Sequence, residues 1–494
     1  MSELRAKTIA GVGWMVGMRF IVNIIGFIST AILAHLLTPA DFGVVALAGS
    51  AYAFFTLLGQ FGFDNALIFL KDAEKAHYDT AWTANIITGV LIAVILYMVA
   101  KPAAIFFEDT RIEYVIYSFT ILSLAKGYEN IGVVNFRKYL EFRGDFLYFV
   151  VPKIIGVMTG ITAAFILRNY WALVIGMAAS QLTTLIYSHL SQPLRPKLSL
   201  AKFYELFSYT RWILANNLLR YLSNNSIELI IGKIQNTSAV GIFGIARQIA
   251  YLPSTEIMAP INRALFPSFS SISEDTTRIR SIFFKAISMI SLLTIPSAFG
   301  ILAVSDLIVL VLLGSKWTAV GPILSVLGFV GVLQSVSSLG GPILRARGKP
   351  KKVTRFLVQN VILLLPLSIA GAIHFGTIGV AYASLLSTFI MTPVILTAVK
   401  KEIECNLYLI SKCIWRPLVA SIIMSLTVHF AKLSTLSLFS TASISLPILI
   451  IIGIVVYCFV ILIFWIIAGR PDGAEREVLI LILKYFHRHR VNPA

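Results

Sequence analysis

The segment ISLPILIIIGIVVYCFVILIFWIIA, residues 444–468, contains no charged side chain. A helix needs about 20 mainly apolar residues to cross the hydrocarbon core of a bilayer, so this segment is predicted to span a membrane. The whole chain has the same character, because 57% of its 494 residues are hydrophobic and only 13% are charged. A soluble protein carries about 25% charged residues. The composition therefore excludes a soluble enzyme, a disordered chain and a disulfide-rich secreted scaffold.

Thirteen more apolar runs, each bounded by charged residues, glycine or proline, precede this segment. The loops between them are too short to hold a soluble domain. We therefore predict an all-α integral membrane protein with about 14 transmembrane helices. The other spans are expected near 11–36, 41–69, 80–100, 112–132, 146–167, 171–191, 207–232, 238–270, 282–304, 318–344, 354–374, 378–399 and 413–431.

The distribution of charge predicts the orientation. Lys and Arg number 41 against 23 Asp and Glu, a formal charge of +18. With the N-terminus in the cytoplasm, 29 of the cations lie in or beside cytoplasmic loops and six in or beside the opposite loops. Because cytoplasmic loops are enriched in Lys and Arg, we expect a bacterial cytoplasmic (inner) membrane protein with both termini in the cytoplasm. This bias explains most of the net charge without a ligand.

Six cations remain within the predicted spans. Lys153 and Arg211 lie near cytoplasmic span ends, and we interpret them as side chains that snorkel to the interface. The other four lie deeper, where a charge costs at least about 2.5–3.5 kcal/mol. We predict that these four face a hydrated interior, and they are Arg19, Arg220, Arg247 and Arg263.

The seventh predicted span, 207–232, carries a stripe of polar side chains. Its members share one helical face and are Asn217, Arg220, Asn224 and Glu228. The first span repeats the pattern with Arg19 and Asn23, four residues apart. These residues are predicted to line a substrate cavity. The alternative is that they only join neighbouring helices through hydrogen bonds.

A weak internal repeat organises the chain. A shift of 198 residues pairs Trp14 with Trp212 and Gly43 with Gly241, and it aligns the spans in the same order. Two related halves with a site between them are typical of transporters. We predict two six-helix bundles, helices 13–14 and a basic cytoplasmic tail, at 1–197, 198–400, 401–469 and 470–494 respectively.

Three carboxylates are candidates for ion coupling. The eighth span, 238–270, contains three prolines, which are expected to break the helix and mark a transport site. Glu256 lies among these prolines, Asp64 follows Gly62 in the second span, and Glu228 lies in the seventh. Either these groups couple transport to H+ or Na+, or a nearby arginine neutralises them.

The deep arginines suit an anionic substrate, because guanidinium binds phosphoryl oxygens bidentately and is weakly hydrated. The sequence has no G-x-x-x-x-G-K-[ST] motif and no His or Cys spacing typical of a metal site. We therefore expect no ATP site, no catalytic residue, no metal and no resident cofactor. Nucleic acid is not an expected partner.

Five segments resemble, in their order along the chain, motifs of the polysaccharide transporter family of the MOP superfamily, most closely its WzxC-like flippases. They are LLTPADFGVVAL (36–47), FRKYLEFRGDF (136–146), LFPSFSSISED (265–275), LLGSKWTAVGPIL (312–324) and LRARGKPKKV (344–353).

This resemblance implies a MATE-like fold with two bundles around a cationic cavity, and spans 13–14 beside a groove for a lipid tail. It implies a flippase that moves undecaprenyl-diphosphate-linked oligosaccharide to the periplasmic leaflet for exopolysaccharide or lipopolysaccharide biosynthesis. The cationic-cavity role would fall on Arg19, Arg220, Arg247 and Arg263. Membrane lipids and the polysaccharide polymerase or export machinery would be further partners.

Two other functions remain open. A MATE-like multidrug or cation antiporter would have a cavity rich in carboxylates, whereas the deep charges here are mainly arginine. A membrane polysaccharide polymerase or glycosyltransferase would need a sizeable external loop or an acidic metal motif, and the sequence contains neither.

Overall fold

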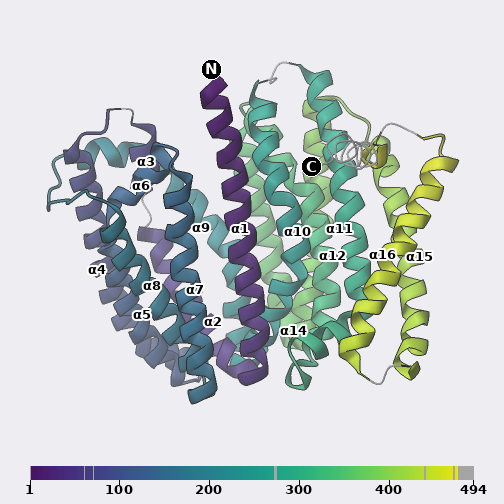
Figure 1. Ribbon diagram of the computed structural model, residues 1–494, viewed down its shortest axis with the longest axis horizontal. Coiled ribbons are helices and arrows are strands. Elements are labelled where there is room, and N and C mark those ends of the chain that lie inside the picture. Colours follow the sequence, from purple (N-terminus) through teal and green to yellow (C-terminus); the bar gives the residue numbers. More distant parts are fainter. Residues whose placement is uncertain are drawn as a thin grey trace, which may run out of the picture. The chain divides into compact units, whose positions relative to one another are not determined.

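The computed structural model describes the backbone of residues 2–59, 62–70, 72–271, 275–438, 441–470 and 473–476. Their side chains are described too, except chiefly those at 2–12, 15–16, 207–217, 220, 224 and 259–271. Throughout these residues the regular elements are helices (Figure 1). The chain divides into two compact units, Met1–Gly244 and Ile245–Ala494. The domain boundaries near 197 and 400 stay predictions.

The first unit is a bundle of long helices with short helices at two of its connections. Its strongest packing joins α7 to α8 and α4 to α5. In chain order its elements are α1 (Ser2–Leu36), α2 (Pro39–Gly59), α3 (Phe63–Phe69), α4 (Lys75–Phe107), α5 (Arg111–Gly127), η1 (Ile131–Val133), α6 (Val134–Lys138), α7 (Phe142–Leu167), α8 (Trp171–Ser191), α9 (Phe203–Ile234) and the start of α10 (Thr237–Ser271).

The second unit packs around α11, which contacts α12, α15 and α16. The hydroxyl of Tyr457 on α16 donates a hydrogen bond of 2.7 Å to the carbonyl oxygen of Leu292 on α11. After α10, its elements are α11 (Thr276–Leu312), η2 (Ser315–Trp317), α12 (Val320–Ser338), α13 (Gly340–Ala346), α14 (Pro350–Ile403), α15 (Leu407–Leu438) and α16 (Ala442–Ile467).

The helix α14 contains two of the predicted spans. Gly376 has φ 66° and ψ −151°, a conformation that glycine adopts without strain. The chain reverses there, because Glu402 near the end of α14 forms an ion pair of 2.7 Å with Lys349, the residue just before the start of α14. A Cβ on Gly371 would come within 2.5 Å of the carbonyl oxygen of Gly379, so the two arms pack closely.

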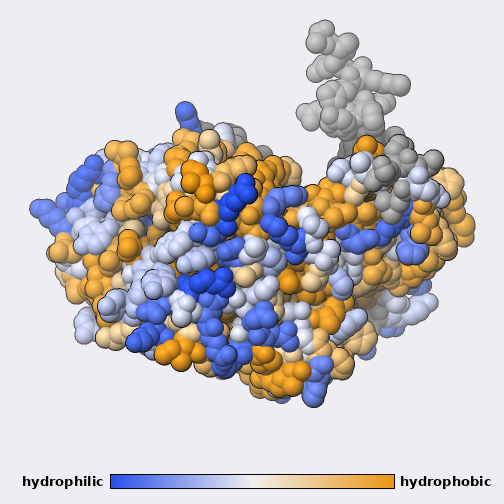
Figure 2. All heavy atoms as spheres, turned by 90° about the horizontal axis from the view of Figure 1, so that it is seen from below, coloured by the Kyte–Doolittle hydropathy of each residue, from blue (hydrophilic) through white to orange (hydrophobic). Residues whose placement is uncertain are grey.

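Ten helices of the described chain are long and apolar enough to cross a membrane. One of these is the double-armed α14, and α5, α9 and α10 coincide with three further predicted spans. The architecture is consistent with the predicted fourteen crossings. The outer faces suit lipid, because side chains such as Ile166 and Ile467 are each 75% exposed. Figure 2 shows large hydrophobic areas at the surface beside hydrophilic ones.

One expectation about helix breaks is wrong. The helix α10 continues through Pro253, Pro260 and Pro267 to Ser271, because a proline removes one backbone donor and neighbouring groups in a bundle compensate for it. The second span, in contrast, is interrupted. Its two parts, α2 and α3, are separate helices, and Gly62 before α3 has φ 71°.

Alternate loops of the first unit lie at opposite ends of its bundle, as the predicted topology requires. Contacts at one end join the loops after α1, α4, α7 and α9, and contacts at the other end join the loops after α3, α5 and α8. The first set is Tyr170–Asp41, Arg111–Thr237 and Lys233–Glu108, and the second is Lys138–Leu70, Asn130–Leu194 and Lys197–Asp79.

The starts of α2 and α10 meet backbone to backbone. A Cβ on Gly43 would overlap the carbonyl oxygen of Thr237 and lie 3.1 Å from the amide nitrogen of Gly241. Conversely, a Cβ on Gly241 would overlap the carbonyl oxygen of Pro39 and lie 3.0 Å from the amide nitrogen of Gly43. Pro39 and Thr237, like the two glycines, are 198 positions apart. The repeated segments therefore pack against each other reciprocally.

We expect Gly43→Ala and Gly241→Ala each to lower the unfolding free energy by about 1–3 kcal/mol, the usual cost of overpacking. The matched control is Gly244→Ala, because Gly244 lies one turn later on α10 with no atom within 4 Å of an added Cβ. Thermal unfolding of detergent-purified protein measures the effect. Equal melting temperatures for Gly43→Ala, Gly241→Ala and Gly244→Ala would contradict the close crossing.

Candidate functional site

A polar cavity of about 410 Å³ lies inside the first unit. Side chains from α2, α3, α4, α5, α6 and α7 line it, and it sits at the end of the bundle where the loops after α3 and α5 meet. Its charged lining residues are Asp64, Lys126, Glu129, Arg137 and Asp145, with Asn85, Thr88, Ser123 and Tyr148 among the uncharged polar ones.

Glu129 is the best-positioned acid of this cavity. The Tyr148 hydroxyl donates a 2.9 Å hydrogen bond to its Oε2, and the Gln181 amide donates one of 2.6 Å to its Oε1. Tyr148 comes from α7 and Gln181 from α8, so two helices fix the carboxyl group. These two donors leave lone pairs on both oxygens free for a further ligand.

The charges of the cavity do not cancel. Arg137 and Asp145 form an ion pair of 3.2 Å. Among the remaining lining residues, Lys126 is the single cation for two carboxyl groups, Asp64 and Glu129. The Asp64 side chain is accessible to solvent. A water-accessible site with one carboxylate in excess suits reversible binding of a proton or a monovalent cation.

Glu228, another predicted coupling residue, lies outside this polar cavity, where α9 contacts α2. It is buried, and its Oε2 accepts a 2.6 Å hydrogen bond from the Ser50 hydroxyl of α2. The Tyr221 hydroxyl donates 2.8 Å to the carbonyl oxygen of Ser50. This cluster fastens α9 to α2, and Glu228 does not line the cavity that holds Asp64.

The other predicted site residues are only partly placed. Arg19 and Asn23 are half-buried on α1 of the first unit, and Arg247 and Glu256 are half-buried on α10 in the second. Four predicted side chains lie outside the described set, namely Asn217, Arg220, Asn224 and Arg263. A shared cationic cavity formed by these residues stays a prediction.

Sequence reasoning missed the residues around Glu129. The run KGYEN (126–130) ends the fourth predicted span, so its polar residues resemble an ordinary loop boundary. The proximity of Glu129 to Tyr148 and Gln181 depends on tertiary packing across 19 and 52 residues of chain. A glutamate at the end of an apolar run was the single local signal.

The second unit contains an apolar cavity of about 1020 Å³. Its walls come from α11, α12, both arms of α14, and α15, and they include Phe299, Phe329 and Phe389. A cavity of this size and character suits a long hydrocarbon chain. Span 13 corresponds to α15 and borders this cavity, whereas α16 adds no residue to the described lining. The lipid-tail groove that the resemblance implies stays a prediction.

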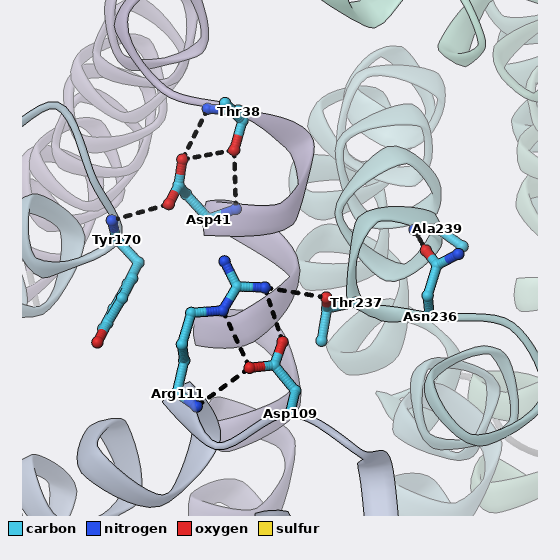
Figure 3. Close-up of polar contacts among 8 residues, drawn as sticks. All are labelled: Thr38, Asp41, Asp109, Arg111, Tyr170, Asn236, Thr237 and Ala239. Atoms are coloured by element: carbon cyan, nitrogen blue, oxygen red, sulfur yellow. Dashed lines mark hydrogen bonds and ion pairs between the residues drawn. The ribbon is translucent and has the colours of Figure 1, made fainter.

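The end of the first unit opposite the polar cavity is fastened by two polar clusters (Figure 3). Asp41 accepts hydrogen bonds from the Thr38 amide and hydroxyl and from the Tyr170 amide, at 2.9, 2.6 and 3.0 Å. Asp109 and Arg111 form a bidentate pair, and Arg111 also donates 3.4 Å to the Thr237 hydroxyl.

The Asp109 carboxyl lies in the loop between α4 and α5. Burial raises its pKa, but its hydrogen bonds with Arg111 lower the pKa more, so the pKa lies below the ordinary value of an aspartate. The carboxylate form is therefore favoured wherever this loop is folded.

A family of proteins described as "Polysaccharide biosynthesis protein" matches residues 32–322 of the chain. The chain is 26% identical to the lipopolysaccharide biosynthesis protein WzxC of Escherichia coli K12 over 79% of its length and 80% of that protein. It is 25% identical to the teichuronic acid biosynthesis protein TuaB of Bacillus subtilis 168, over 93% and 96% respectively. These matches confirm the resemblance found in the sequence.

Solved structures show the same fold. The lipid II flippase MurJ in an inward closed conformation superposes with a TM-score of 0.73 at 15% identity, covering 93% of this chain and all of that one. An inward-facing multidrug resistance MATE transporter of the MOP superfamily superposes with a TM-score of 0.59 at 11% identity, covering 78% and 96%. The fold is thus that of the MOP transporters.

The loop ion pair predicts a pH-dependent stability. An aspartate with a lowered pKa stabilises the fold above its unfolded pKa of about 3.9, and this contribution is lost as the pH falls through the folded pKa. Asp109→Asn should therefore cost about 1 kcal/mol at pH 7, because the Arg111 side chain is 38% exposed and solvent screens the pair.

Melting temperatures of wild type and Asp109→Asn, measured from pH 7 down to pH 3, test this expectation. The difference should shrink below pH 4. Asp72→Asn is the control, since Asp72 is an exposed carboxylate in another loop of the same unit. A difference that grows on acidification would contradict the lowered pKa.

Proposed function

The chain belongs to the family of polysaccharide biosynthesis proteins, and from this membership we propose that it is a flippase for a lipid-linked oligosaccharide. The substrate would be an undecaprenyl-diphosphate-linked oligosaccharide, used for exopolysaccharide or lipopolysaccharide biosynthesis. The protein would move it from the cytoplasmic to the periplasmic leaflet of a bacterial inner membrane. Alternating access between the two halves is the mechanism we propose.

The observation that carries the proposal is the pairing of two unlike cavities with a membrane fold. A lipid-linked oligosaccharide has a polar, anionic head and a long apolar tail. The second unit offers an apolar cavity of about 1020 Å³ for hydrocarbon, and the first unit has a polar interior. A purely hydrophilic solute would need no apolar cavity.

We propose that cations receive the diphosphate. Arginine binds phosphoryl oxygens with two parallel hydrogen bonds and keeps its charge at any physiological pH. The proposed contacts are Arg19, Arg220, Arg247 and Arg263, with Asn23, Asn217 and Asn224 as donors to the sugars.

We propose that a proton or Na+ gradient drives transport through carboxylates. Asp64 and Glu129 would form the coupling site of the first unit, because they share one cation in a water-accessible cavity. Glu228 and Glu256 are the further candidates. Consumption of the glycan by a periplasmic polymerase or export complex would also pull the equilibrium forward.

Two alternatives are weaker. The fold is shared with multidrug antiporters, but deep arginines would repel a cationic drug. A polymerase or glycosyltransferase is also a weaker proposal, because the proteins that share this fold or sequence include flippases and transporters. One of them is a probable low-salt glycan biosynthesis flippase of Haloferax volcanii, which is 30% identical over 45% of this chain and 47% of that one.

We expect a strain that lacks this protein to accumulate the lipid-linked glycan on the cytoplasmic leaflet. Arg220→Ala and Arg263→Ala should restore less than a tenth of the export that wild type restores, because each removes a diphosphate contact worth about 1.5–3 kcal/mol. Leaflet-specific labelling of the glycan in intact cells and inverted vesicles measures the outcome. Full complementation by both alanine variants would exclude the diphosphate role.

We expect Glu129→Gln to fold normally and to lose most of the acceleration that a pH or Na+ gradient gives to transport. Glutamine keeps the size of the side chain but cannot carry the charge. Glu113→Gln is a matched control, since Glu113 lies on the adjoining α5 and also accepts a hydrogen bond from a tyrosine hydroxyl, at 3.0 Å from Tyr117. Gradient-driven transport that is the same for Glu129→Gln as for wild type would exclude coupling through Glu129.

A further inference from the structure

A second cavity of the first unit, of about 470 Å³, lies between α1, α2, α7 and α8. Its lining is mostly small or apolar, with Ser29, Ser180 and Gln181 as uncharged polar members. Lys153 is the one charged residue in this lining. The cavity therefore presents a single positive charge inside an otherwise neutral wall.

Glycines shape the cavity where α7 meets α8. A Cβ on Gly156 would lie 2.6 Å from the Ser180 Cβ and 2.8 Å from the carbonyl oxygen of Gly176. A Cβ on Gly176 would lie 2.9 Å from the carbonyl oxygen of Gly156. The two backbones approach this closely because neither has a side chain at the crossing, and Lys153 stands one turn before it.

The position of Lys153 does not fit the expected snorkelling. It lies 11 residues from the start and 14 from the end of α7, Phe142–Leu167. Its Nζ is 3.8 Å from the place that a Cβ of Gly26 on α1 would occupy. The ammonium group therefore points across to the neighbouring helix near mid-depth instead of toward a helix end.

The ammonium group has no ion pair among the residues that the structure describes. Glu129 reaches this wall through the Gln181 amide that lines the cavity, and its two oxygens already accept hydrogen bonds from Gln181 and Tyr148. A charge at membrane depth is costly unless a partner compensates it. An anionic ligand would offset that cost.

We propose that this cavity is an anion subsite in which Lys153 binds a phosphoryl group of the transported lipid. The inference rests on the proposed flippase function and adds a residue to it. Lysine binds phosphate as a point charge, and the rest of the wall is mostly small or apolar, with three uncharged polar residues for contacts to a sugar. Most of the glycan would lie outside this cavity while its phosphoryl end enters.

Purified protein in proteoliposomes, with inorganic pyrophosphate as the probe, tests binding separately from transport. We expect pyrophosphate to raise the melting temperature of wild type and of Lys153→Arg, which keeps the positive charge. Lys153→Met keeps the length of the side chain without charge, and it should weaken pyrophosphate binding at least tenfold. Lys101→Met is the control, because Lys101 is an exposed lysine of the same unit.

Transport assays on the same variants identify the source of the phosphoryl group. In phosphatidylcholine vesicles, which contain no anionic lipid, Lys153→Met should flip the lipid-linked glycan at least tenfold more slowly than wild type. A defect that appears only when phosphatidylglycerol is added would assign the cavity to a bilayer lipid and overturn the proposal.

Three further results would overturn it. These are pyrophosphate binding by Lys153→Met equal to that of wild type, a folded Lys153→Arg as defective as Lys153→Met, and a wild type that flips the glycan but does not bind pyrophosphate. A Lys153→Arg variant as defective as Lys153→Met would indicate that the amine titrates during transport instead of binding an anion. A wild type that binds pyrophosphate but flips no glycan would refute the flippase function and leave the anion subsite standing.

Discussion

The first unit depends on one backbone contact, the crossing of α2 and α10 at Gly43 and Gly241. No side chain fits between the two helices there, so both positions require glycine. The contact sets the separation of the two helix starts, and the polar clusters of Asp41 and Arg111 are built beside it (Figure 3). Each glycine packs against the other and against the residue four positions before it, and equivalent residues are 198 positions apart. The contact therefore relates the two copies of a repeat that is faint in the sequence.

A reciprocal contact between repeated segments has the logic of a symmetric dimer interface. Each segment presents the same surface and must be complementary to itself. A glycine at one position then serves both partners after duplication. The N-terminal turns of α2 and α10 are also capped at equivalent positions, since the Asp41 amide donates a hydrogen bond to the Thr38 hydroxyl and the Ala239 amide donates one to Asn236 Oδ1.

The spans could be predicted from the sequence because lipid imposes a simple rule on length and polarity. The predicted spans 171–191 and 444–468 agree closely with α8 and α16. Helix interruptions were harder to predict. The break at Gly376 falls between the predicted spans 354–374 and 378–399, as expected. Gly62, in contrast, separates two helices within one predicted span, and the three prolines of α10 interrupt nothing, because whether a helix breaks depends on what its neighbours supply.

The site was predictable only in part. Asp64 was recognised as an acid within a span, and it does line a polar cavity. Glu129 and Lys153 were not recognised as site residues, because each has an ordinary explanation in the sequence. Glu129 lies at a loop boundary, and Lys153 resembles a lysine that snorkels to the interface. Their importance comes from what packs around them, namely Tyr148 and Gln181 around the acid and Gly26 beside the ammonium.

The function that we propose, transfer of a diphosphate-linked glycolipid across a bilayer, can be measured on the purified protein. The most direct measurement reconstitutes the purified protein in vesicles whose labelled undecaprenyl-diphosphate oligosaccharide is first confined to one leaflet. The fraction of label that an impermeant glycan-cleaving enzyme reaches from the other side is then followed with time. We expect this fraction to rise with time in vesicles that contain the protein and to stay at its initial value in protein-free vesicles. Equal rates in both kinds of vesicle would exclude the flippase function.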